Sequence, residues 1–110
     1  KKDKIKTSVS YETAETLFSE NRFLEAELAL DTLISQTPND PASWRLKGLI
    51  QASRGNVGEA SKAFQTYVQT SANSEEAIAS LKKLAVSKDN TGSNIRQAAN
   101  QALINIEKIR

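Results

Sequence analysis

The chain contains no cysteine, no histidine and no methionine among its 110 residues. Without cysteine there is no disulfide, no thiolate metal site and no cysteine nucleophile, and either redox compartment is tolerated. Without histidine the chain lacks the commonest general acid–base group and the commonest metal ligand. We therefore expect neither a metal nor a cofactor, and the compartment stays open.

Long apolar runs are also missing: no stretch approaches the roughly 20 residues that span a bilayer, so no membrane span is expected. The 15 basic and 13 acidic side chains leave a formal net charge of +2. This balance argues against a nucleic-acid partner. The basic start, residues 1–6, is typical of a frayed, solvated terminus, with contact to a membrane surface or an anionic partner as the alternative. Because the chain begins at lysine, we expect a processed protein or an excised domain.

Only six residues are aromatic, so alanine and leucine must do most of the packing, which suits helices at short distance. The stretch 38–64 predicts a helical hairpin. Asp40 is expected to cap the first helix with its carboxylate, and Pro41 fits the first helical position. Gly55 can take the left-handed conformation that ends this helix, and Asn56 is expected to cap the next.

Helical spacing of apolar residues continues through the rest of the chain. Asn21 is expected to end the first helix in the left-handed region, and Ser74 to cap the fifth helix. Residues 88–93 are expected to form a loop. No strand-like alternation occurs, so the fold class is all-α, with helices over about 8–20, 22–36, 41–54, 57–70, 75–87 and 94–109.

The chain also repeats itself. A shift of 34 residues places 7–40 over 41–74 with six identical pairs: Ser19/Ser53, Glu25/Glu59, Ala26/Ala60, Ala29/Ala63, Thr32/Thr66 and Asn39/Asn73. At other positions small residues meet small ones, as in Ala14/Gly48, and bulky residues meet bulky ones, as in Leu30/Phe64. Small residues let helices approach, and bulky ones fill the space between hairpins.

The period and these residues resemble the tetratricopeptide repeat. In the second repeat the matching positions are Trp44, Gly48, Ala60 and Phe64, and the departures are Lys47, Gln51 and Ala72. In the first, the matching positions are Ala14, Ala26, Leu30 and Pro38, while Ser10 stands where the second has Trp44. The resemblance covers residues 7–74.

The resemblance implies a right-handed α-solenoid of about three helical hairpins, forming a single domain over 1–110. Its parts would be a first repeat at 7–40, a second at 41–74, and a third helical pair or cap at 75–110. The last part reads either as a degenerate third repeat or as a HEAT-like cap, since residues 95–103 look like the second helix of a HEAT repeat. In both cases it would cover the end of the solenoid.

In this family the first helix of each pair lines a concave face that often binds an extended peptide or a helix. Carried over by position, the main lining candidates are Tyr11, Glu15, Phe18, Arg45, Leu49 and Lys83. The remaining positions are Ser8, Ser19, Ala42, Ala52, Ser53, Glu76 and Ala79. Such a face suits a peptide with apolar anchors flanked by acidic residues. The alternative is that Phe18 and Leu49 are buried between helices.

One binding mode of the family is not expected here. Co-chaperone members hold a C-terminal carboxylate with lysine and asparagine residues on these helices. Tyr11 and Glu15 stand at two of those places in the first repeat, and Leu46 at one in the second. Glu15 would repel a carboxylate, so capture of a chaperone tail is not predicted.

No catalytic constellation appears either. The serines have no base to activate them, and the carboxylate pairs Glu12/Glu15 and Glu25/Glu27 read as solvated helix faces. The function expected is therefore a non-catalytic scaffold or adaptor that binds a protein or peptide. One alternative is self-association through Ile104, Ile109 or Trp44. The position of Trp44 in the repeat, however, indicates packing in the core or between repeats. The other is an accessory domain of an enzyme encoded outside this segment.

Overall fold

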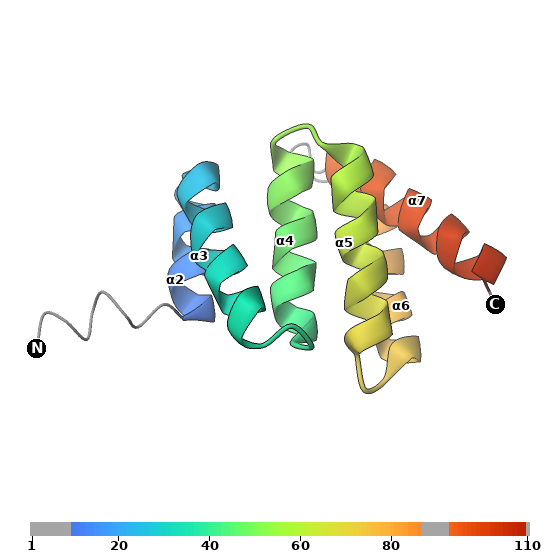
Figure 1. The fold of residues 1–110 in the computed structure, drawn as a ribbon. Coiled ribbons are helices and arrows are strands. Elements are labelled where there is room, and N and C mark those ends of the chain that lie inside the picture. The colour runs from blue at the N-terminus through green and yellow to red at the C-terminus, as the bar shows by residue number, and fades with distance from the viewer. Residues whose placement is uncertain (1–9, 87–92, 110) are drawn as a thin grey trace, which may run out of the picture.

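The computed structural model describes residues 10–86 and 93–109, and these residues form six helices and no strand (Figure 1). The all-α prediction is confirmed for this part of the chain. The expected frayed start, the first two residues of the first expected helix, and residues 88–92 of the expected loop lie outside the described residues. Ser10, expected in the first helix, precedes it as its N-cap, and Ser93, expected in the loop, begins the last helix. The helices are α2 (Tyr11–Ser19), α3 (Phe23–Gln36), α4 (Pro41–Ser53), α5 (Val57–Thr70), α6 (Ser74–Ala85) and α7 (Ser93–Ile109).

The starts of α4 and α6 are capped differently from the prediction. Asp40 does precede α4, but its carboxylate accepts from the Ser43 hydroxyl at 2.8 Å and makes no bond to a backbone N–H. The residue that caps α6 is Asn73, not Ser74, since Asn73 Oδ1 accepts from the backbone N–H of Glu76 at 3.1 Å. In both places an Asx residue stands where the chain turns into the helix.

The turns after α2 and α4 have the same geometry. Asn21 and Gly55 both lie in the left-handed region, at φ 64° and 87°, as the sequence predicts. The residue after each returns a backbone hydrogen bond to the carbonyl five positions earlier, from Arg22 to Leu17 at 2.9 Å and from Asn56 to Gln51 at 2.8 Å. This pattern satisfies carbonyls that the helix end leaves open. The two turns are one repeat apart in the sequence.

The helices run alternately up and down in Figure 1, while α7 crosses the others at an angle. The most extensive packing is between α4 and α5, and α3 packs against both α2 and α4. The end of the chain breaks this regularity. α5 packs more extensively against α7 than against α6, and α7 also reaches α4.

Two apolar clusters form the core of the described residues. The first joins α2, α3 and α4 through Ala14, Ala26, Leu30, Leu46 and Ile50. The second joins α4 to α7 through Ala52, Ala60, Phe64, Val68, Ala77, Leu81, Ala98, Ala99, Ala102 and Ile106. The half-buried Leu49 packs against both. The side chain of Leu49 therefore connects the two clusters across α4.

Burial agrees at two key pairs of the 34-residue alignment. Ala14 and Gly48 are both buried, and Leu30 and Phe64 are both fully buried. Gly48 has a specific packing reason, because a Cβ placed there would lie 2.5 Å from Cδ1 of Phe64 and 2.9 Å from its Cζ. The ring of Phe64 occupies the space that any larger residue at 48 would need.

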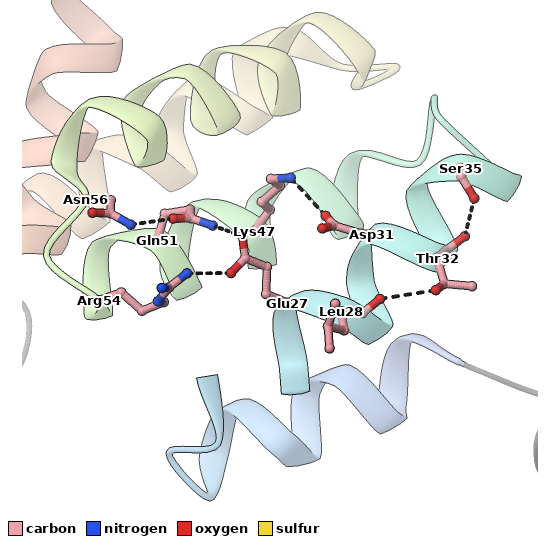
Figure 2. Close-up of polar contacts among 9 residues, drawn as sticks. All are labelled: Glu27, Leu28, Asp31, Thr32, Ser35, Lys47, Gln51, Arg54 and Asn56. Carbon is pink, nitrogen blue, oxygen red and sulfur yellow. Dashed lines mark hydrogen bonds and ion pairs between the residues drawn. The ribbon is translucent and has the colours of Figure 1, made fainter. Parts of the chain in front are cut away.

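A set of polar side chains joins α3 to α4, and we call it the polar seam: Glu27, Asp31, Lys47, Gln51, Arg54 and Asn56 (Figure 2). Gln51 is 4% exposed, and its amide donates to Glu27 Oε2 at 2.6 Å and accepts from Asn56 Nδ2 at 2.9 Å. Arg54 pairs with the other oxygen of Glu27, and Lys47 pairs with Asp31 at 2.9 Å. Every buried side-chain polar atom among the described residues has a partner.

The polar seam explains two departures from the sequence prediction. Gln51, at the position where the repeat signature has tyrosine, is the centre of the seam. Asn56 stands at the N-cap position of α5, but its side chain makes no cap bond and contacts Gln51 instead. Glu27, read from the sequence as solvated, is 23% exposed at its side chain and makes contacts in the seam.

Trp44 belongs to neither apolar cluster, so the predicted core role is wrong, while its contact with Pro38 joins 41–74 to 7–40, as the inter-repeat alternative expects. It is half-buried, its indole N–H donates to the carbonyl of Pro38 at 2.8 Å, and the Lys47 ammonium lies 5.8 Å from its ring centroid. Trp44 therefore holds the turn before α4. On α7, Ile104 is 50% exposed.

Candidate functional site

Two separate hollows contain most of the residues that the sequence places on the face of α2, α4 and α6. The upper hollow, near the C-terminal ends of α2 and α4, has a volume of about 520 Å³. It is lined by Phe18, Ser19, Asn21, Phe23, Leu49, Ser53 and Ile95. Four of these, Phe18, Ser19, Leu49 and Ser53, were expected on the face.

The lower hollow lies at the N-terminal ends of α2, α4 and α6 and has a volume of about 470 Å³. It is lined by Tyr11, Pro41, Ala42, Arg45, Tyr67, Ser71, Ala72, Asn73, Glu76, Ala77 and Ser80. Four of these, Tyr11, Ala42, Arg45 and Glu76, were expected on the face. The two hollows follow one another along α4.

Aromatic and aliphatic side chains dominate the upper hollow. Phe18 and Phe23 lie with their ring centroids 5.7 Å apart, and Leu49 faces them from α4. Both Phe18 and Leu49 are half-buried, so each contributes to the core and to the hollow wall. The two sequence alternatives for these residues, groove lining and burial between helices, therefore both apply in part. Such a wall suits an apolar side chain.

Arg45 is the central polar residue of the lower hollow. Its guanidinium is half-buried, and its Nε donates to the Ser80 hydroxyl across 3.4 Å. Beside it, burial raises the pKa of the Tyr11 phenol above its ordinary value, and the carboxylate of Glu15 raises it further. The positive charge of Arg45 opposes this rise, and Asp40 adds to it. Tyr11 is thus neutral at physiological pH and is a hydrogen-bond donor beside a cation.

The other expected face residues lie elsewhere. Glu15 is exposed on α2 and Lys83 is exposed on α6, and neither lines a hollow described here. Ala52 was expected on the face, but it is fully buried in the second apolar cluster because α7 packs against that side of α4. Ala79 is exposed on α6, and Ser8 lies outside the described residues.

Sequence reasoning missed residues contributed by helices outside the expected set. Ile95 comes from α7 and closes one side of the upper hollow, and Tyr67 and Ser71 come from the end of α5. Tyr67 pairs with Leu33 in the repeat alignment, which indicated packing and not a polar hollow. The position of Ile95 depends on the crossing of α7, which no local pattern encodes.

The described residues offer few groups for acid–base or metal chemistry. Glu25 accepts from Arg22 at 2.7 Å, and this hydrogen bond lowers the pKa of its carboxyl. No group of three aspartate, glutamate, cysteine or histidine residues gathers there as a metal site. Among the described helices none is both long enough and apolar enough to cross a membrane.

In comparisons with family models, curated proteins and solved structures, nothing matched this chain. The two hollows and the repeat pattern are therefore the features that bear on function.

Proposed function

We propose that this chain is a short, tetratricopeptide-like α-solenoid that acts as a non-catalytic protein–protein interaction module. It binds an extended segment of a partner protein on the face that α2, α4 and α6 share. The observation that carries the proposal is the pair of hollows along α4, one apolar and one centred on Arg45. A peptide that crosses α4 can place side chains in both.

Matched features one repeat apart support the solenoid architecture. Asn21 and Gly55 adopt the same left-handed turn, and the small residues Ala26 and Ala60 are both fully buried. A unit of this kind cannot bury both faces alone and gains its core from the neighbouring unit. The apolar cluster shared by α2, α3 and α4 agrees with that requirement.

The face is tested by affinity capture on the immobilised chain, followed by calorimetry with each captured protein. We expect Arg45→Glu to weaken capture. Lys62→Glu, the same charge reversal at an exposed α5 position that lines neither hollow, should leave it unchanged. Ser53→Lys is the second face variant, because it fills the upper hollow without removing Leu49 from the two apolar clusters. Equal binding by all three variants, each shown to be folded by circular dichroism, would refute the proposed face.

Self-association is the second candidate, and the 50% exposure of Ile104 favours it. Burying this side chain in a subunit contact would remove apolar area from water at about 25 cal/mol per Å². Sedimentation at several concentrations decides between the two, since a monomer at every concentration excludes an Ile104 contact. If a dimer forms, Ile104→Glu should dissociate it.

A further inference from the structure

We infer that the two hollows bind a single extended peptide carrying a carboxylate and a large apolar side chain about two to four residues apart. The carboxylate is bound by Arg45 in the lower hollow, and the apolar side chain enters the upper hollow. This inference rests on the proposed function, and it specifies the ligand.

The positive charge and the unused N–H donors of Arg45 favour a carboxylate as the ligand. Arg45 is half-buried, yet among the described residues it makes no ion pair, whereas Arg22 and Arg54 each pair with a carboxylate. A guanidinium has five N–H donors, and Arg45 directs only one of them to Ser80. A carboxylate can accept two of the remaining donors side by side, which is the strongest pairing available to arginine.

Neighbouring groups in the lower hollow act on a carboxylate in both directions. The Tyr11 phenol is protonated at physiological pH, as a tyrosine ordinarily is, and burial and Glu15 raise its pKa further, so it can donate to an anionic ligand. Glu76, which lines the hollow, opposes such a ligand, and so do Glu15 and Asp40, whose negative charges act on Tyr11. Glu76 is exposed and solvated, so its repulsion is screened more than the attraction of the half-buried Arg45.

The spacing follows from the geometry of α4. A helix rises about 1.5 Å per residue, so Arg45 and Leu49 are about 6 Å apart along the axis, and Ala42 and Ser53 about 16 Å. Along the α4 axis, the separation of the two hollows therefore lies between these limits. An extended chain advances about 3.3 Å per residue and returns to the same face every second residue. A ligand thus reaches both hollows with side chains about two to four positions apart.

The test is selection from a random-sequence peptide display library on the immobilised chain. The wild-type chain should enrich peptides with aspartate or glutamate about two to four residues from a large apolar side chain. Arg45→Glu should replace the acidic preference by a basic one and retain the apolar preference. Ser53→Lys should remove the apolar preference. Lys62→Glu should enrich the same peptides as the wild type.

Affinities of the enriched peptides give the second readout. Because hydrogen bonds to charged groups contribute about 1.5–3 kcal/mol, Arg45→Glu should weaken an acidic peptide by at least about tenfold. Glu76→Gln should strengthen the same peptide. Enriched peptides that bind without an acidic residue at the stated spacing would overturn this inference and leave the proposed function standing. No enrichment by the folded wild-type chain would refute both.

Discussion

Gly48 provides the sharpest test of the packing between α4 and α5. A Cβ at this position would lie 2.5 Å from Cδ1 and 2.9 Å from Cζ of Phe64, below the 3.0 Å that Cβ contacts respect. Phe64 is fully buried within the second apolar cluster, so its ring cannot move into solvent. The substitution Gly48→Ala must therefore displace the ring or separate the two helices.

The expected change in the free energy of unfolding for Gly48→Ala combines two opposing contributions. Overpacking of a buried site costs about 1–3 kcal/mol, and the overlap with Phe64 places this site at the upper end. Replacing glycine by alanine inside a helix stabilises it by about 1 kcal/mol. The net expectation for Gly48→Ala is a loss of about 2 kcal/mol. At about 4–8 °C per kcal/mol for a domain of this size, Tm should fall by on the order of 10 °C.

Gly58→Ala is the matched control, because Gly58 also lies in a helix but no neighbouring group comes within 4 Å of the position that a Cβ would take. Thermal and urea unfolding should show a gain of up to about 0.5 kcal/mol for this variant. In a double-mutant cycle, Phe64→Leu should cost less in the Gly48→Ala background than in the wild type. Equal stability of Gly48→Ala and Gly58→Ala would refute the close approach of α4 and α5.

Three further predictions concern the caps, the polar seam and the lower hollow. Asn73→Ala should lower the free energy of unfolding by about 1 kcal/mol, measured in urea, because α6 loses its side-chain cap. Gln51→Leu should cost about 1–3 kcal/mol in the same assay, because Glu27 loses a buried hydrogen bond. Tyr11 has a raised pKa in the folded state, so its stabilising contribution is complete below pH about 10 and is lost as pH rises through the folded pKa. NMR titration of the Tyr11 ring should show this shift, and Arg45→Glu should increase it.

Local signals in the sequence were sufficient for most helix boundaries. Left-handed turns need residues that tolerate positive φ, so Asn21 and Gly55 marked two helix ends. The starts of α3 to α7 were placed within one residue and α2 begins three residues later than predicted, yet the partner of the capping group was predicted less well. Asp40 bonds to Ser43, and Asn56 bonds to Gln51, because nearby side chains compete with the backbone for the same polar group.

The candidate site could be predicted only for residues on helices that belong to the aligned stretches 7–40 and 41–74. Tyr11, Phe18, Arg45 and Leu49 line hollows because the positions of α2 and α4 follow from the alignment of 7–40 with 41–74. Their division into two hollows was not predictable. It depends on which residues lie beside the face, and these come from the ends of α5 and α7.

The crossing of α7 explains two differences between the predicted face and the observed one. Its alanine-rich stripe, Ala98, Ala99 and Ala102, is fully buried and lets the helix approach closely. Because this stripe packs against α5 and α4, α7 occupies space beside α4 where the sequence prediction had an open face. The same packing buries Ala52 and brings Ile95 to the upper hollow. The face predicted from the repeat pattern therefore holds at most positions of α2 and α4, with Glu15 and Ala52 as the exceptions, and the packing of α7 affects which positions stay open.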